Sequence, residues 1–197
     1  MTPATRRPPE GGVMTLAYAD GVAAQVVELL GPACTRIEVA GSVRRRRATV
    51  GDVEVVCISR MAPEQVDLFG EVITERNLLD QLCDRLQAEG VLSKRVGEGG
   101  STAWGYGARR AWFNGIALDI FGTTAPQFGV ALLLRTGPAA WNKRLVLQYG
   151  HGGTVLRFGM RFEGGWLWRG NSRLPTLEER DVFRELQLAW VEPWERG

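Results

Sequence analysis

Three carboxylates on two predicted strands are the side chains in this 197-residue sequence best placed to carry out chemistry. Asp52 and Glu54 stand two residues apart beside the β-branched run at 53–58, so a strand there projects both from one face. Asp119 lies within the apolar run at 116–121, where a carboxylate is costly unless something compensates its charge. If the two strands are neighbours, the carboxylates converge, and their mutual repulsion favours bound divalent cations, Mg²⁺ above all. Two such ions roughly 3.5–4 Å apart can hold the attacking and leaving oxygens of a phosphoryl displacement.

A basic, glycine-containing loop at 41–51 precedes the carboxylate pair. Gly41 and Gly51 let a backbone approach phosphates closely, and their N–H groups can line an anion-binding nest. Ser42 adds a hydroxyl group, and Arg45 can reach phosphate oxygens. Taken alone, the carboxylate pair would rather indicate a solvated start of a strand, and the run of four arginines a solvated loop. Together, a phosphate cradle beside a carboxylate cluster favours a site for a metal-bound nucleoside triphosphate.

Apolar periodicity predicts the elements that position these residues. It predicts helices at 15–30, 77–89, 124–134 (stopping at Gly137), 139–148 and 176–187, the last opened by a capping box of Thr176 and Glu179. It predicts strands at 37–40, 53–58 and 116–121, and hairpins within 91–113 and 154–169. The fold class is therefore α+β, with a disordered segment at 1–13 and a domain boundary near residue 125.

The composition is that of a globular protein, 45% apolar and 23% charged, with a formal net charge of +2. That net charge averages over unlike parts, because residues 91–173 carry 11 basic and 3 acidic side chains, whereas residues 51–90 carry 3 and 9. The basic stretch also holds aromatic side chains that can either stack on nucleic-acid bases or pack in hairpins: Trp104, Tyr106, Trp112, Trp166 and Trp168.

Several classes of protein are disfavoured by what the sequence lacks. No run approaches the roughly 20 apolar residues of a membrane span, and the first residues lack the apolar segment of a signal peptide, so we expect a cytoplasmic protein. The three cysteines have no CxxC spacing, which argues against a disulfide framework or a zinc site. The one histidine, His151, stands in a glycine turn, which disfavours chemistry built on a histidine base.

Four segments together resemble a known family. Residues 41–56, GSVRRRRATVGDVEVV, resemble the signature of nucleotidyltransferases of the DNA polymerase beta type, the X family. ALDIF at 117–121 is similar to the strand that bears the third metal carboxylate. LLLRTGPAAWNKRL at 132–145 resembles the Thr-Gly turn and helix at the nucleotide, and residues 176–196 resemble the closing helix and Glu-Pro segment. The resemblance runs from about residue 15 to the end and is closest to small phage and prophage forms.

The resemblance implies a fold and a set of site residues. The fold would be a nucleotidyltransferase palm at 14–124, a mixed sheet flanked by helices, followed by a small α+β thumb at 125–197. Asp52, Glu54 and Asp119 would be the catalytic ligands of two Mg²⁺ ions, or Mn²⁺ in their place, with Asp119 nearest the attacking 3′-hydroxyl. The nucleotide would be bound by Gly41, Ser42, Arg45, Gly51, Thr136, Gly137, Asn142 and Lys143.

The implied function is that of a DNA-directed DNA polymerase. Such an enzyme adds nucleotides from nucleoside triphosphates to a primer 3′-hydroxyl in gapped or nicked DNA and releases pyrophosphate, here as a monomer in the cytoplasm of a bacterium or a phage-infected host. Two other classes stay open: a nucleotidyltransferase that modifies a small molecule or protein, and a nucleic-acid-binding module with a weakened site. The thumb-like C-terminus counts against the first, and the complete set of three carboxylates counts against the second.

Overall fold

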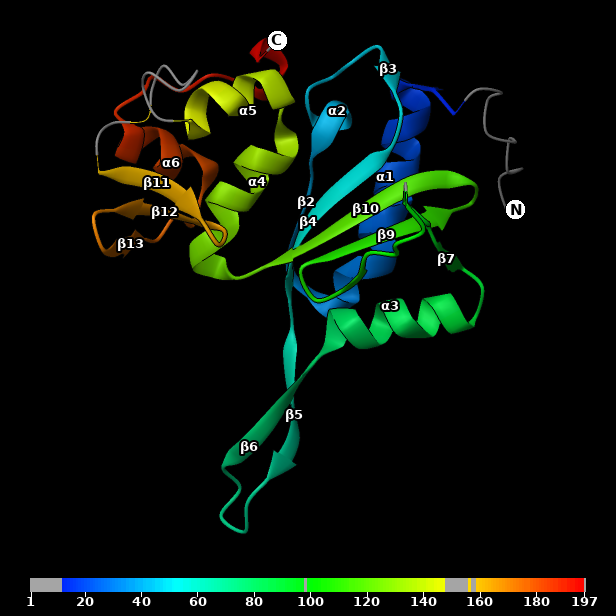
Figure 1. The fold of residues 1–197 in the computed structure, drawn as a ribbon. Helices are drawn as coiled ribbons and strands as arrows, with labels where there is room; N and C mark the ends of the chain where they lie inside the picture. The colour runs from blue at the N-terminus through cyan, green and yellow to red at the C-terminus, as the bar shows by residue number, and fades with distance from the viewer. Residues whose placement is uncertain (1–11, 98, 148–155, 157–158, 197) are drawn as a thin grey trace.

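The computed structural model describes residues 12–97, 99–147, 156 and 159–196, and it shows two lobes with an arm that extends from one of them (Figure 1). The predicted disordered segment at 1–13 lies almost entirely outside the described residues, as does His151. No helix in the described ranges combines the length and the apolar character needed to cross a membrane. The mixture of helices and strands confirms the predicted α+β class.

A mixed sheet forms the centre of the N-terminal lobe. Its strands lie in the order β2 (Cys34–Val39), β4 (Val53–Ser59), β10 (Ile116–Thr123), β9 (Ala108–Phe113) and β7 (Leu92–Lys94), with the short β8 (Trp104–Gly105) paired to β9. The two central strands, β4 and β10, run parallel, and every other pair in this sheet is antiparallel. This arrangement makes the strands predicted to carry the carboxylates direct neighbours.

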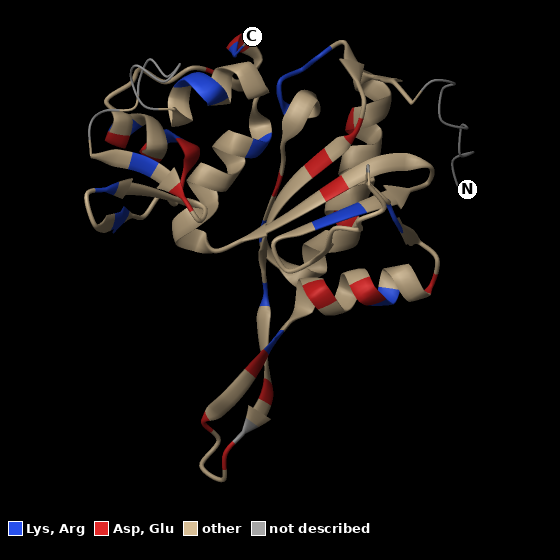
Figure 2. Ribbon diagram, in the orientation of Figure 1, with Lys and Arg blue, Asp and Glu red and all other residues tan. Residues whose placement is uncertain are grey.

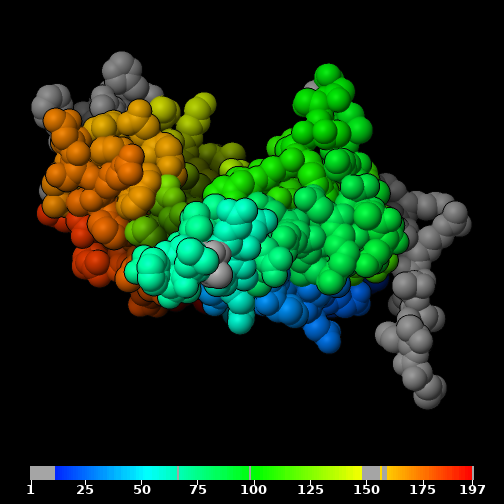
Figure 3. All heavy atoms as spheres, turned by 90° about the horizontal axis from the view of Figure 1, so that it is seen from below, coloured from blue at the N-terminus to red at the C-terminus, as the bar shows by residue number. Residues whose placement is uncertain are grey.

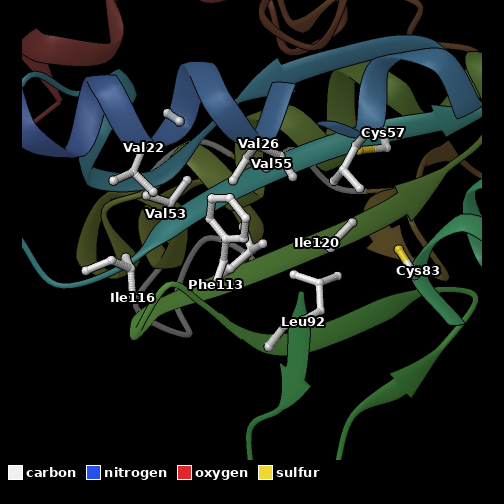
Figure 4. Close-up of a cluster of buried hydrophobic side chains, with 14 of the residues drawn as sticks. Val22, Val26, Val53, Val55, Cys57, Cys83, Leu92, Phe113, Ile116 and Ile120 are labelled. Carbon is white, nitrogen blue, oxygen red and sulfur yellow. The ribbon is translucent and has the colours of Figure 1, made fainter. Parts of the chain in front are cut away.

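Two helices cover one face of this sheet. α1 (Leu16–Leu30) and α3 (Leu78–Ala88) bury their apolar sides against the same face, on which Val53 and Val55 of β4 and Ile120 of β10 also lie (Figure 4). Thr15 and Asn77 cap the two helices, because their side-chain oxygens accept hydrogen bonds from backbone N–H groups of the first turn. Strand residues of the opposite parity are thereby left to the other face.

The other face of the sheet meets the C-terminal lobe through α4 (Phe128–Thr136), which follows a 3₁₀ turn at Ala125–Gln127. Phe128 and Leu132 pack on Val56 and Phe121 in a small buried cluster. Gly129 lets the chain approach closely, since a Cβ atom there would lie 2.3 Å from the carbonyl oxygen of Glu178. The domain boundary near residue 125 stays a prediction, and α4 packs against both lobes.

The rest of the C-terminal lobe is a small α+β unit with its own core. It contains α5 (Ala139–Val146), a three-stranded antiparallel sheet of β11 (Met160–Glu163), β12 (Trp166–Arg169) and β13 (Ser172–Leu174), α6 (Glu179–Leu186) and a 3₁₀ turn at Pro193–Glu195. Residues from these elements form one buried cluster centred on Leu133, Leu167 and Phe183. The hairpin predicted within 154–169 is described only in part, since 154, 155, 157 and 158 lie outside the described residues.

The structure differs from the sequence-based prediction in three local features. The predicted loop at 41–51 contains a helical turn, α2 (Gly41–Arg44), and a short strand, β3 (Thr49–Val50), which pairs with β1 (Met14–Thr15). The capping box of α6 is formed by Glu178 and Asp181, not by Thr176 and Glu179, because Glu179 is buried in another interaction. A long hairpin of β5 (Met61–Val66) and β6 (Val72–Asn77) was not predicted at all.

Glu179 joins the two lobes through two arginines. Its side chain is 3% exposed and accepts a hydrogen bond of 2.5 Å from Nη1 of Arg196, whose own side chain is fully buried. Its second oxygen lies 2.7 Å from Nη2 of Arg44 on α2, an ion pair by distance that lacks the angles of a hydrogen bond. The guanidinium of Arg196 also stacks near the rings of Trp141 and Trp190. One carboxylate therefore ties α2 to the core of the C-terminal lobe.

Replacing Glu179 should destabilise the protein strongly. Glu179→Ala leaves Arg196 buried with no carboxylate, and we expect a loss of about 3–5 kcal/mol in the free energy of unfolding. Glu185→Ala on the same helix is the matched control, because Glu185 is 25% exposed and pairs at the surface with Arg169, and its cost should stay within about 1 kcal/mol. Urea denaturation measures both, and equal losses would contradict the structural role of Glu179.

Candidate active site

The structure brings the three predicted carboxylates to one face of the sheet. Glu54 and Asp119 are register partners on the parallel strands β4 and β10, and Asp52 lies just before β4 (Figure 2). Since Val53 and Val55 point into the core, Asp52 and Glu54 point to the opposite face. The sequence predicted that Asp52 and Glu54 share one face, and it left open whether the two strands are neighbours. The structure pairs β4 with β10, so that condition is met.

The three carboxylates repel one another electrostatically. Burial, and then repulsion from Asp119, raises the pKa of Asp52. Burial, and then repulsion from Asp52 and Asp119, raises the pKa of Glu54 to about 7. Attraction to Arg135 and Arg45 opposes part of the rise at Glu54. Negative charge at this place is therefore unfavourable until a cation accompanies it.

Two arginines pair with the carboxylate of Asp119. Oδ1 of Asp119 accepts a hydrogen bond from Nη2 of Arg95, which directly follows β7, and Oδ2 lies 3.8 Å from Nε of Arg110, the register partner of Asp119 on β9. Neither arginine was predicted to be part of the site. Arg110 has the parity of an outward residue on β9, which is a usable sequence signal, but nothing in the sequence places Arg95 beside Asp119.

The donor set suits divalent cations, although the side chains are not arranged around one. Three carboxylates, two of them with raised pKa values, are the oxygen ligands that Mg²⁺ prefers. Within the described part of the chain, no group of three or more His, Cys, Asp or Glu side chains converges closely enough to hold a metal ion. Asp119 instead pairs with Arg95, so the residues fit a cation in their chemistry and Asp119 has a competing partner.

The predicted phosphate-binding turn lies directly beside Glu54. Gly41 has a φ of +63° and opens α2, and a Cβ atom there would lie 1.9 Å from Oε2 of Glu54, so only glycine fits. The N–H of Ala40 donates to the carbonyl oxygen of Glu54 at 2.8 Å. Oγ of Ser42 is buried without a hydrogen-bond partner. Gly51 is exposed just before Asp52. Ala40, Gly41 and Gly51 thus lie next to Asp52 or Glu54, and the hydroxyl group of Ser42 has no hydrogen-bond partner.

The Thr136–Gly137 turn is held against this arginine-bearing segment. Nη1 of Arg44 donates to Oγ1 of Thr136 at 2.7 Å, and Nη1 of Arg45 donates to the carbonyl oxygen of Thr136. Gly137 has a φ of +66°, and a Cβ atom there would lie 3.1 Å from Nη1 of Arg45. The turn that begins at Gly41 therefore contacts the turn at Thr136, although the two residues are 95 positions apart in the sequence.

The last two predicted nucleotide-binding residues lie on α5. Nδ2 of Asn142 donates to the carbonyl oxygen of Leu134 at 2.7 Å, which ties α5 to α4, while its Oδ1 is buried without a partner. Lys143 is exposed one position further along the helix. Their part in nucleotide binding stays a prediction. Arg135, which was not predicted, stacks on the ring of Phe121 at 3.7 Å, close enough for the charges of Glu54 and Asp119 to act on it.

A groove opens in front of these residues. Figure 3 shows the molecule hollowed between the orange C-terminal lobe and the green segment around residue 100, with yellow-green residues of the α4–α5 region at its floor. Arg110 and Trp112 of β9 lie on the same face of the sheet as Asp119. The side chain of Arg110 is 52% exposed, and Trp112 is 42% exposed. Trp104, in contrast, donates its ring N–H to Asp84 and packs on the core, so it is structural.

Comparison with known proteins finds one family. Residues 131–197 match the family model of the DNA polymerase beta thumb. This match relates the C-terminal third of the chain to DNA polymerase beta. No curated protein matches the chain. The matched range begins within α4 and covers the rest of the C-terminal lobe, so the resemblance noted for that part of the sequence is confirmed, and that of residues 14–130 stays a prediction.

The pKa of Glu54 makes stability depend on pH. In metal-free protein, folded Glu54 keeps its proton up to about pH 7, whereas the unfolded chain releases it near its ordinary pKa of 4.5, so stability should fall as pH rises through this interval. Glu54→Gln should flatten that fall and raise the free energy of unfolding at pH 8 by about 2–3 kcal/mol, since one pKa unit is about 1.4 kcal/mol. Denaturation with EDTA at pH 5 and pH 8 measures it.

The control is Glu28→Gln, a substitution of an exposed glutamate on α1. It should leave the pH dependence of stability as it is in the wild-type protein. If Glu54→Gln and Glu28→Gln give the same difference between pH 5 and pH 8, the raised pKa of Glu54 is refuted.

Proposed function

We propose that the protein is a small DNA-directed DNA polymerase of the X family type. It adds nucleotides to a primer 3′-hydroxyl in gapped or nicked DNA and releases pyrophosphate. The observation that carries the proposal is the meeting of Glu54 and Asp119 on adjacent parallel strands with the arginine turn and the Thr136–Gly137 turn beside them. The match of the C-terminal lobe to a polymerase thumb supports the same reading.

Asp52, Glu54 and Asp119 would hold the cations, Mg²⁺ or Mn²⁺. Such ions lower the pKa of a hydroxyl nucleophile and neutralise charge on the reacting phosphate. The raised pKa values of Asp52 and Glu54 support this assignment, because a bound cation would offset the repulsion that causes them. Binding at Asp119 requires that its carboxylate leaves Arg95, so the arginine and the cation compete for one ligand.

The arginine turn would position the triphosphate. Arg45 is already fixed by Thr136, so its guanidinium loses little freedom when an anion binds. The unpartnered Oγ of Ser42 provides a donor for a phosphate oxygen. Gly137 supplies a flat, side-chain-free surface next to Arg45 for the sugar. The chain's own contribution to the reaction is thus orientation and charge stabilisation, which suits phosphoryl transfer.

Exposed cationic and aromatic residues along the groove would bind DNA. Arg110 can pair with backbone phosphates, and Trp112 can stack on an unpaired base of a gap. Their position beside the carboxylates supports a primer end delivered to Asp119. Under this proposal the basic residues of 91–173 bind DNA although the net charge of the whole chain is only +2.

Primer extension on DNA with a one-nucleotide gap tests the function. With Mg²⁺ and each nucleotide in turn, we expect incorporation directed by the template base. Asp119→Ala should abolish the transfer and leave nucleotide binding largely intact, because Asp52 and Glu54 still hold the nucleotide's cation. Asp20→Ala, at an exposed aspartate of α1, should leave extension unchanged.

The outcomes separate the proposal from its rivals. Labelling of a small molecule or a protein with no primer extension would show a different nucleotidyltransferase. DNA binding with no transfer to any acceptor would show a binding module whose site is inactive. Near-normal extension by Asp119→Ala would refute the assignment of the carboxylates.

A salt titration tests the DNA-binding groove. Each neutralised phosphate contributes about one to the slope of log affinity against log salt concentration, so Arg110→Ala should weaken binding to all DNA sequences and lower the slope by about one. Arg85→Ala is the matched control, because Arg85 is 66% exposed on α3 and away from the carboxylates. Fluorescence anisotropy with a labelled gapped duplex measures both, and an unchanged slope in Arg110→Ala would exclude that contact.

A further inference from the structure

The β5–β6 hairpin forms an arm (residues 61–77) that stands away from both lobes (Figure 1). Within the described part of the chain, its two strands pair only with each other. Among the described residues, 12 large apolar side chains are exposed, and five of them lie on this arm: Met61, Leu68, Phe69, Val72 and Ile73. Exposed apolar side chains gathered on one projecting element indicate a surface that binds a partner.

The tip of the arm is built to display two of these side chains. Oδ1 of Asp67 accepts hydrogen bonds of 2.8 Å from the N–H groups of both Phe69 and Glu71. The N–H of Asp67 donates to the carbonyl oxygen of Glu71 at 2.8 Å, and Gly70 takes a φ of +83° to close the turn. Leu68 and Phe69 are left 101% and 92% exposed. A turn whose backbone is fixed in this way presents an aliphatic–aromatic pair at a lower entropic cost than a flexible loop would.

The base of the arm is fixed as firmly as its tip. The N–H of Arg60 donates to Ala33 at 2.8 Å, and the carbonyl oxygen of Arg60 accepts from Leu78 at 3.0 Å. Oγ of Ser59 lies 2.6 Å from Oδ1 of Asn77, the residue that caps α3. The base of the arm is therefore tied both to the end of β4 and to the start of α3.

Charge excludes DNA as that partner. The arm carries four acidic residues, Glu64, Asp67, Glu71 and Glu75, and one basic residue, Arg76 (Figure 2). A phosphate backbone would be repelled by this arm. A partner that matches it needs an apolar pocket for Leu68 and Phe69 with cationic side chains at the rim.

The arm also points away from the reaction. Glu54 lies near the start of β4, and the arm begins at Met61, beyond the end of the same strand. Because the arm projects away from both lobes, a partner bound at residues 68–69 would leave the groove free for DNA (Figure 1). Under the proposed function, such a partner must stay with the primer end without occupying the groove, and a protein ring that encircles the duplex satisfies both conditions.

We propose that the arm docks its Leu68–Phe69 tip into an apolar, cation-rimmed pocket on a DNA-encircling sliding clamp. The proposal rests on the proposed polymerase function. The clamp would hold the chain at the primer end while the groove binds the DNA. The acidic residues beside the tip steer it toward the pocket and away from the DNA inside the ring.

Binding to a purified bacterial sliding clamp tests the proposal directly. Titration of the full-length chain against the fluorescently labelled ring, with no DNA or nucleotide present, should give saturable binding. The double variant Leu68→Ala/Phe69→Ala should weaken it at least about tenfold, because the pair forms the centre of the contact. Glu71→Lys should also weaken clamp binding, and the loss of affinity should be larger at low salt than at high salt. Leu177→Ala, at a 55% exposed leucine of the C-terminal lobe, is the control and should bind as the wild type does.

A second measurement keeps the two proposals apart. Extension of a one-nucleotide gap on a short linear duplex without clamp should be equal for the wild type and the double variant, because the arm lies outside the groove. Wild-type protein that extends primers and does not bind the clamp overturns the docking proposal and leaves the polymerase function standing. If the double variant still binds the clamp as the wild type does, the docking proposal is also overturned. It is overturned as well if the wild-type protein forms a dimer that the double variant does not form, because the arm would then bind a second copy of the chain. Clamp binding without any extension overturns the proposed function instead.

Discussion

The double pairing of Glu179 is the interaction on which the arrangement of the site depends. A carboxylate with 3% exposure must be compensated, and it takes one arginine from each lobe, Arg44 and Arg196. Arg44 then also reaches Thr136, so the same interaction that closes the interface fixes the turn under the arginine segment. The phosphate-binding residues and the core of the C-terminal lobe are therefore one cooperative unit, and neither can shift without breaking a buried charge pair.

The carboxylate cluster beside the arginine turn follows the same rule. Asp119 is only 6% exposed, and Arg95 and Arg110 compensate its charge. At Glu54, burial and then repulsion from Asp52 and Asp119 outweigh the attraction to Arg135 and Arg45, and its pKa rises to about 7. The site is thus balanced unevenly, with Asp119 neutralised by the chain itself and Glu54 left to the protons or cations that solution supplies.

The parts of the structure that were predicted from the sequence are those with strong local signals. α1, α3, β4 and β10 begin and end within about two residues of their predicted bounds, because their apolar positions repeat with a clear period. α4 begins four residues later than predicted, because Ala125–Gln127 form a 3₁₀ turn instead of its first turn. The arm was missed because its strands bury no face, and an unburied strand has no alternation to detect. Arg95 was missed because its contact with Asp119 is made between segments 24 residues apart, which no local pattern records.

The distribution of charge shows why a net value says little about what a small protein binds. Of the nine acidic residues in 51–90, four lie on the arm and three on α3 and its C-cap, whereas Asp52 and Glu54 belong to the candidate site (Figure 2). The arm, with its four carboxylates, was not predicted from the sequence. Arg110 and Trp112 meanwhile line the sheet face beside Asp119. Because screening limits each charge to about 8–10 Å, a partner responds to the face it touches, and a net charge of +2 can accompany both a cationic groove and an anionic arm.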